Sequence, residues 1–174
     1  MTKRDEYLKK DLNYVQAVAG FIVSDGKVLL GKRKKVSNDL GKDLYAGIGG
    51  KVDANETTDE CLEREIYEEI GVKVTKYQKL GQLKYINPHN PKWDMEGHFY
   101  LINKWVGKPQ ETDVIKPIWF DIEEIPTENM FTDNKYWLDL LFVGKRFKGV
   151  FLFGSEKSQV VEYRLEEKSN AGIR

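Results

Sequence analysis

The segment from Thr57 to Gly71 constrains the fold most, because both ends of a helix can be read in it. Thr57 and Glu60 have the spacing of a capping box, in which the two side chains and the first backbone amides satisfy one another. Gly71 is the residue type favoured just past a helix end. At about 100° per residue, one narrow apolar stripe is formed by Leu62, Ile66 and Ile70. The pattern therefore predicts a helix over 57–70 that packs on a core along one face.

Runs of apolar and β-branched residues around this helix predict strands. The expected strands ahead of the helix are 15–23 and 27–32, joined by a tight turn, with short extended pieces over 44–52 after an exposed loop at 33–43. Those after it are 72–86, 97–104, 115–120, 150–153 and 160–165. A second apolar helix is expected over 135–143, and a weak helical pattern over 5–12 offers Tyr7, Leu8 and Leu12 for packing on the core.

The length and charge of the chain narrow the class of protein. With 174 residues, we expect one domain over 1–174, and its N-terminal part, 1–13, is expected to be a helical extension. The chain has 28 Lys and Arg residues and 28 Asp and Glu residues, so it has no net positive charge that would favour binding of a polymeric nucleic acid. The charge balance does not exclude a small anionic ligand. The single Cys61 permits no internal disulfide, and the sequence shows no apolar run of membrane-spanning length. We therefore expect a cytoplasmic protein, either a monomer or a homodimer, that does not bind membranes.

Three acidic residues cluster beside the apolar stripe of the expected helix: Glu65, Glu68 and Glu69. Like charges at this spacing repel and lower helix stability unless a positive charge lies among them. An oxygen-rich cluster suits Mg²⁺ or Mn²⁺. A divalent cation is therefore the expected neutraliser.

A short glycine segment ahead of the helix supplies a second element of the same chemistry. Gly49 and Gly50 let the backbone approach an anion closely, and Lys51 adds a positive charge for phosphate. Taken singly, a Glu pair on a helix is usually a solvated face and a Gly pair is usually a turn. Their joint spacing over 50–72 decides otherwise, because its seven fixed residues would coincide about once in 10⁸ starting points at roughly 6% usage each. The fixed positions are Gly50, Glu56, Arg64, Glu65, Glu68, Glu69 and Gly71.

This spacing resembles the motif of the Nudix family at every position. The resemblance implies an α/β/α sandwich with a mixed central sheet. It also implies metal ligands at Glu65, Glu68, Glu69 and the carbonyl of Gly49. Arg64 and Glu56 are similar to residues that orient those ligands, with Glu60 and Glu68 within reach of Arg64 as helical neighbours. Glu69 is a candidate general base, and we include Lys51 in the catalytic set.

Beyond the motif, the chain from Val28 to Leu165 is similar to the branch of oxidised purine nucleoside triphosphatases, the MutT homologues. The shared runs are LGQLKY from Leu80, His98, IWF from Ile118, IP from Ile125, NMFTDNKYW from Asn129 and KRFKGVFLF from Lys145. By this likeness Arg33 holds the triphosphate together with Gly50 and Lys51. The base pocket would be lined by Tyr85, Met95, Phe131, Asp133, Asn134 and Trp137. Stacking and soft apolar contacts suit a purine ring, and Asp or Asn can read its edge.

The chain departs from that branch at several positions. Ala46 and Val18 stand where the branch has an asparagine and a threonine, and Asn134 and Phe131 replace an aspartate and a tryptophan. Buried hydrogen-bond partners decide between near-isosteric ligands, so these changes affect base selectivity. Val114 occupies the place of an acidic residue near the metal, for which Glu111 or Asp113 could substitute.

The sequence therefore predicts Mg²⁺-dependent hydrolysis of a purine nucleoside triphosphate, such as 8-oxo-dGTP, to the monophosphate and pyrophosphate. One alternative keeps the same site but cleaves ADP-ribose, a sugar nucleotide or a dinucleoside polyphosphate. Another is a nucleotide-binding module without catalysis, against which the intact set of carboxylates argues. We expect Cys61 to pack as a small hydrophobe and His98 to be structural, so neither is given a catalytic role.

Overall fold

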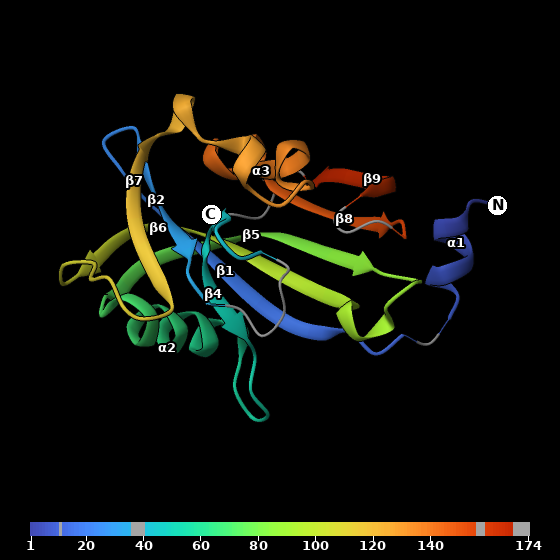
Figure 1. The fold of residues 1–174 in the computed structure, drawn as a ribbon, viewed down its shortest axis with the longest axis horizontal. Coiled ribbons are helices and arrows are strands. Elements are labelled where there is room, and N and C mark those ends of the chain that lie inside the picture. Colours follow the sequence, from blue (N-terminus) through green and yellow to red (C-terminus); the bar gives the residue numbers. More distant parts are fainter. Residues whose placement is uncertain (11, 36–40, 156–158, 169–174) are drawn as a thin grey trace.

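The structure, a computed structural model, describes residues 1–10, 12–35, 41–155 and 159–168. Part of the loop expected over 33–43 therefore lies outside the described residues. Within them the strands form one mixed sheet in the order β3-β2-β1-β6-β5-β8-β9, with β4 also pairing with β1 and β7 with β2. Figure 1 shows the sheet running across the molecule between helices.

Strand β1 (Val15–Ser24) is the element that positions the site, because it has different partners along its length. Its last residues pair antiparallel with β2 (Lys27–Arg33), which closes the expected hairpin. Its middle residues, Ala17–Gly20, pair antiparallel with β4 (Ile48–Lys51). The other edge of β1 runs parallel to β6 (Met95–Val106). Backbone from 49–50 is thereby held against the middle of the sheet.

The remaining strands extend the sheet on both sides. Strands β3 (Tyr45–Ala46) and β7 (Ile115–Asp121) both pair antiparallel with β2. On the other side β5 (Lys73–Ile86) pairs antiparallel with β6 and parallel with β8 (Arg146–Phe153), and β9 (Val160–Lys168) completes this edge. The expected strands are confirmed, with bounds that differ by a few residues.

Helix α2 (Thr58–Ile70) is the helix predicted from the sequence, with Thr57 as its N-cap. The Thr57 hydroxyl accepts from the Glu60 amide at 3.1 Å, and the Glu60 carboxylate accepts from the Thr57 amide at 3.3 Å. Gly71 ends the helix at a φ of 72°, a left-handed conformation that costs glycine little. The apolar stripe packs on one face of the sheet, in a core that also contains Ile22, Ile48, Tyr100 and Ile102.

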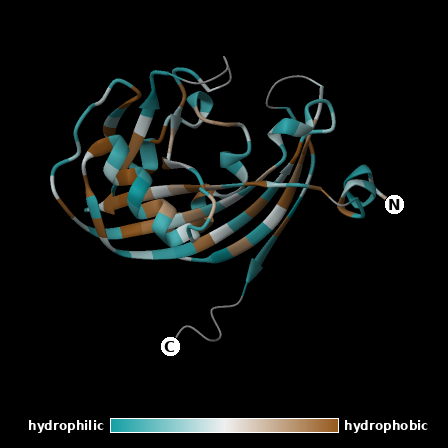
Figure 2. Ribbon diagram, turned by 90° about the horizontal axis from the view of Figure 1, so that it is seen from below, coloured by the Kyte–Doolittle hydropathy of each residue, from teal (hydrophilic) through white to brown (hydrophobic). Residues whose placement is uncertain are grey.

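Helix α3 (Asn134–Phe142) covers the opposite face, which confirms the predicted α/β/α sandwich with a mixed sheet. The core on this side includes Phe21, Phe99, Trp137 and Phe147. Figure 2 shows hydrophobic and hydrophilic residues alternating along the strands, as expected where each strand faces a core. Among the residues that the structure describes, three short 3-10 helices lie in connections: Pro91–Trp93, Ile122–Glu124 and Thr127–Asn129.

The expected N-terminal helix needs correction. Helix α1 spans Lys3–Leu8, not 5–12 or most of 1–13, and contains no buried residue. Leu8 is 40% exposed, so its packing on the core was overestimated. Instead Arg4 donates to the carbonyl of Tyr163 at 3.4 Å and pairs with Glu162, which ties α1 to the β9 edge, away from α2 (Figures 1 and 2). Within the described ranges, no helix is both long enough and apolar enough to cross a membrane.

Candidate active site

The acidic residues of α2 meet the glycine segment of β4 at one point. A Cβ on Gly50 would lie 2.5–2.6 Å from the carboxylate atoms of Glu65, closer than real Cβ atoms come. Glycine is therefore required at position 50 for this carboxylate to lie over the strand. The helix and strand of the motif thus form one site.

Arg64 connects the acidic residues on this side of α2. It donates to Glu56 from Nε at 2.9 Å and from Nη2 at 2.6 Å, and Nη1 donates to Glu65 at 2.9 Å and Glu68 at 3.2 Å. Asp53 lies 3.4 Å from Nη2, a contact that the motif did not predict. Glu60 was wrongly expected within reach of Arg64, because its carboxylate is engaged in the capping box.

Burial and like charges act on the carboxylates that face inward. Burial, Glu65 and Glu68 raise the pKa of Glu69 to about 7, although the positive charge of Arg33 opposes this. Burial also raises the pKa of Glu65, against the effect of Arg64. Glu56 shows the opposite effect, because its hydrogen bonds to Arg64 and the Asp53 amide lower its pKa to about 2. The site therefore concentrates negative charge that is only partly neutralised by the protein.

The donor set fits a divalent cation in its chemistry, since it consists of carboxylates beside the backbone of Gly49. Within the described part of the chain, no three His, Cys, Asp or Glu side chains are already gathered to hold a metal ion. Glu68 is 57% exposed and turned toward Arg64. Placing all three carboxylates around one ion would therefore require Glu68 to change its rotamer.

A cavity of about 760 Å³ opens beside this helix, within the range of about 300–1,000 Å³ usual for small-molecule sites. Most of the site residues predicted from the sequence line it. They are Arg33, Gly49, Gly50, Lys51, Glu65, Glu69, Tyr85, Met95, Phe131, Asp133, Asn134 and Trp137. Glu56, Arg64 and Glu68 are outside this lining, as expected for the two orienting residues but not for the third proposed ligand.

The predicted base-pocket residues come from β5, β6, α3 and the segment directly before α3. Trp137 is 1% exposed and packs against Phe99, with ring centroids 4.3 Å apart, so it belongs to the core as well as to the cavity wall. Asp133 and Asn134 are 5% and 6% exposed. The Oδ2 atom of Asp133 accepts from the Tyr85 hydroxyl at 2.7 Å and from the Trp137 indole at 2.8 Å. Sequence reasoning had placed these three residues together but had not predicted their hydrogen bonds.

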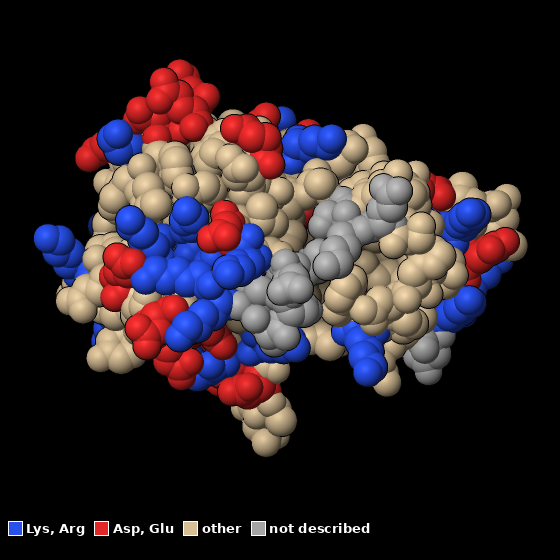
Figure 3. All heavy atoms as spheres, viewed as in Figure 1, with Lys and Arg blue, Asp and Glu red and all other residues tan. Residues whose placement is uncertain are grey.

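Basic side chains contribute to the wall of the cavity. Arg33 has its guanidinium 5.9 Å from the Phe131 ring centroid, and its Nε is buried without a hydrogen-bond partner within the described ranges. Burial lowers the pKa of this guanidinium. Figure 3 shows Lys and Arg gathered over β2 and β7 on this face, with acidic side chains beside them. An anionic group in the cavity would therefore meet Arg33, Lys35 and Lys51.

Three of the positions at which the chain departs from the related branch lie in the wall of the cavity. Val18 and Ala46 line the cavity and offer no polar side-chain group there. Val114 also lines it, but neither Glu111 nor Asp113 is among the described lining residues. Glu111 instead pairs with Lys34, which lowers its pKa. The structure therefore does not support either as a substitute for the missing acidic residue.

The cavity also has a wall that sequence reasoning missed. It includes Asn87, His89, Asn90, Lys92 and Trp93 from the connection between β5 and β6. The Pro and Asn content of this segment had indicated only a loop. Because Val15 pairs with Met95, the segment lies at the start of β1, and this register was the missing information.

Cys61 and His98 lie outside the described lining of the cavity. Cys61 is fully buried, and burial raises the pKa of its thiol to about 12, so it is an inert packing group as expected. His98 is 5% exposed and its Nε2 lies 2.7 Å from Oε1 of Gln16. Its structural role is also in line with expectation.

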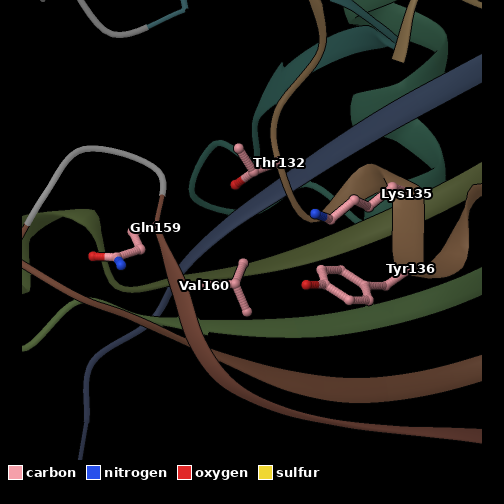
Figure 4. Close-up of a pocket in the computed structure, with 5 residues that line it drawn as sticks. All are labelled: Thr132, Lys135, Tyr136, Gln159 and Val160. Atoms are coloured by element: carbon pink, nitrogen blue, oxygen red, sulfur yellow. The ribbon is translucent and has the colours of Figure 1, made fainter. Parts of the chain in front are cut away.

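A second hollow of about 200 Å³ lies apart from the acidic helix (Figure 4). It is lined by Thr132, Lys135, Tyr136, Gln159 and Val160. This volume falls below the usual range for a small-molecule site. The larger cavity, which alone of the two includes carboxylates of α2, is therefore the candidate active site.

The sandwich fold, with an acidic helix beside a cavity, defines a mixed α/β protein with a candidate metal-binding active site. Residues 13–141 match the family model described as NUDIX domain. The chain therefore belongs to the Nudix family, as its motif predicted.

Two curated proteins and one solved structure that resemble this chain carry names of nucleotide hydrolases or of MutT. The "Oxidized purine nucleoside triphosphate hydrolase" of Danio rerio is 35% identical over 84% of this chain and 90% of that protein, and the Mus musculus protein of the same name is 31% identical over the same shares. A crystal structure of a mutator MutT protein from Bacillus halodurans matches with a TM-score of 0.72 and 20% identity, over 87% of this chain and 97% of that one. The last likeness supports the fold alone.

Proposed function

We propose that this chain hydrolyses a purine nucleoside triphosphate, including an oxidised one such as 8-oxo-dGTP, to the nucleoside monophosphate and pyrophosphate. The observation that carries the proposal is one cavity with the α2 carboxylates in one part of its wall and Asp133, Asn134 and aromatic rings in another. A nucleotide has this same division, since its phosphates are anionic and its base is flat and apolar with a polar edge. The similar proteins of Danio rerio and Mus musculus support it by their names.

Glu65, Glu68 and Glu69, with the Gly49 carbonyl, are the residues that would hold Mg²⁺ or Mn²⁺. A bound divalent cation supplies charge for the phosphate oxygens and lowers the pKa of a water molecule. Arg64 and Glu56 orient this set, because Arg64 donates to both Glu65 and Glu68 while Glu56 holds the guanidinium. Arg33 and Lys51 would meet the remaining phosphate charge from other parts of the wall.

Water would attack the β-phosphorus and lose a proton, while the bond from this phosphorus to the oxygen that bridges it to the α-phosphorus breaks and the nucleoside monophosphate leaves with that oxygen. Glu69 is the candidate to take this proton, because its carboxylate lines the cavity beside the proposed metal ligands. On the other side, Tyr85, Met95, Phe131 and Trp137 would hold the base by stacking and apolar contacts, and Asp133 and Asn134 would read its edge.

A second candidate is hydrolysis of a larger nucleoside diphosphate derivative, such as ADP-ribose or a dinucleoside polyphosphate, at the same carboxylates. It is favoured by the extra wall from 87–93, which adds Trp93 and two basic side chains, His89 and Lys92. We further propose a cytoplasmic protein, since its free Cys61 suits a reducing compartment. The oligomeric state proposed is a monomer or a homodimer.

The test is turnover on 8-oxo-dGTP, dGTP, 2-hydroxy-dATP and ADP-ribose with Mg²⁺, with the products identified. The proposal expects one of the triphosphates to be cleaved fastest, with the monophosphate and pyrophosphate as products. Faster cleavage of ADP-ribose would favour the second candidate. Binding of nucleotides without any turnover would instead favour a non-catalytic module.

A further inference from the structure

Trp93 is a large aromatic side chain in the wall of the cavity that neither hydrophobic core uses. It is half-buried, and among the described residues its indole stacks on no other ring and donates no hydrogen bond. A tryptophan normally packs its ring against apolar groups and gives its N–H a partner where it is buried. The ring and the N–H of Trp93 are therefore both available to a ligand in the cavity.

The other Phe, Tyr and Trp rings of the wall are engaged elsewhere. Tyr85 and Trp137, for example, pack on neighbouring rings of the core beside α3. Phe131 lies outside both cores, but the guanidinium of Arg33 is 5.9 Å from its ring centroid. Within the described ranges, Trp93 is thus the one such ring of the wall without a partner.

The segment that carries Trp93 is held by hydrogen bonds on both sides of the ring. The side-chain amide of Asn87 donates to the carbonyl of Trp93 at 2.8 Å, and the backbone amide of Asn87 donates to Oδ1 of Asp94 at 2.7 Å. Asp94 is 4% exposed, and its carbonyl accepts from the amide of Val15 at 3.0 Å. The backbone of the segment is therefore fixed to the start of β1 before any ligand binds, which lowers the entropy lost on binding.

The register of β1 places Trp93 away from the acidic helix. Val15 pairs with Met95, two residues after Trp93. Val18 pairs with Gly50, which lies against a carboxylate of α2. The three residues of extended strand from Val15 to Val18 span about 10 Å. A nucleotide with its phosphates at the α2 carboxylates would therefore bring its base toward Trp93.

We propose that Trp93 is a substrate-binding residue whose indole ring stacks on the purine base of the bound nucleotide. The inference rests on the proposed function for the identity of the ligand. Stacking of a base on an aromatic side chain contributes about five- to 150-fold in affinity. Because the ring of Trp93 is half-buried and at the edge of the wall, its contribution belongs at the lower end of this range.

The test is the affinity for dGMP, the monophosphate that hydrolysis of dGTP would release, measured by isothermal titration calorimetry with Mg²⁺ present. Trp93→Leu should weaken binding of dGMP by about five- to tenfold, and Trp93→Phe, which keeps a ring, by less than about threefold. Trp119→Leu is the matched control, since Trp119 is 38% exposed in β7 and outside the described lining of the cavity. It should leave the affinity unchanged.

Pyrophosphate, which has no base, is the second probe. Its affinity should be the same in the unaltered chain and in the Trp93 variants. The proposal is overturned if Trp93→Leu binds dGMP as well as the unaltered chain does, if Trp93→Phe loses as much affinity as Trp93→Leu, or if pyrophosphate is weakened equally. Absence of dGMP binding by the unaltered chain overturns it too. Normal dGMP binding without hydrolysis of any purine triphosphate would instead refute the proposed function and leave the role of Trp93 in place.

Discussion

Arg64 donates two hydrogen bonds to Glu56, from Nε to Oε2 at 2.9 Å and from Nη2 to Oε1 at 2.6 Å. This bidentate pair holds the guanidinium so that its remaining N–H groups reach Glu65 and Glu68. The planar fork of an arginine allows this arrangement, and a lysine ammonium does not reproduce it.

Arg64→Lys should therefore reduce kcat/KM by about 10- to 100-fold, the usual cost of losing a residue that orients metal ligands. The rate is to be measured at saturating Mg²⁺, together with the Mg²⁺ concentration for half-maximal rate. Arg164→Lys is the control, since Arg164 is an exposed residue of β9 that pairs with Glu166. Equal rates for the two variants would show that the fork of Arg64 does not matter.

Glu56 should make the stability of the fold depend on pH in an acidic window. Its pKa in the folded chain is about 2, below the value of about 4.3 in an unfolded chain, so its stabilising contribution is present above that higher value. The contribution is lost as the pH falls from about 4.3 through about 2. Glu56→Gln should thus lower the Tm at pH 7, and the difference should disappear near pH 2.

Thermal unfolding followed by circular dichroism from pH 2 to pH 7 measures this difference. Glu128→Gln, at an exposed position, supplies the control and should leave the Tm unchanged throughout. A Tm difference for Glu56→Gln that is as large at pH 2 as at pH 7 would contradict the pairing with Arg64 as its source.

Glu68→Gln and Glu69→Gln should each lower kcat by about 100-fold or more while leaving the fold intact, because each would remove the charge of a proposed metal ligand and no core contact. Glu63→Gln on the same helix is the matched control, since Glu63 is exposed and accepts from Tyr77. Turnover and the Tm are measured for all three. Near-normal turnover in both test variants would remove these carboxylates from the site.

The parts that the sequence predicted are those set by local patterns. The capping box of Thr57 and Glu60 and the glycine at 71 marked α2, and the spacing over 50–72 placed its acids beside Gly50. Alternation and turns also indicated the strands, because such signals lie within a few residues of one another.

The parts that it could not predict depend on contacts between distant segments. The division of β1 between β2 and β4 and its parallel register with β6 follow from tertiary pairing. The hydrogen bonds of Tyr85 and Trp137 to Asp133 likewise join β5 to α3. Helix α1 was misjudged because a weak periodic pattern does not say whether a core is available to cover it.

The central claim is tested most directly by following the products of a purine nucleoside triphosphate by ³¹P NMR while Mg²⁺ is titrated into the protein. The account predicts no turnover without the cation, and with it equal amounts of nucleoside monophosphate and pyrophosphate. Release of the diphosphate and inorganic phosphate, or a rate that is independent of divalent cations, would contradict it.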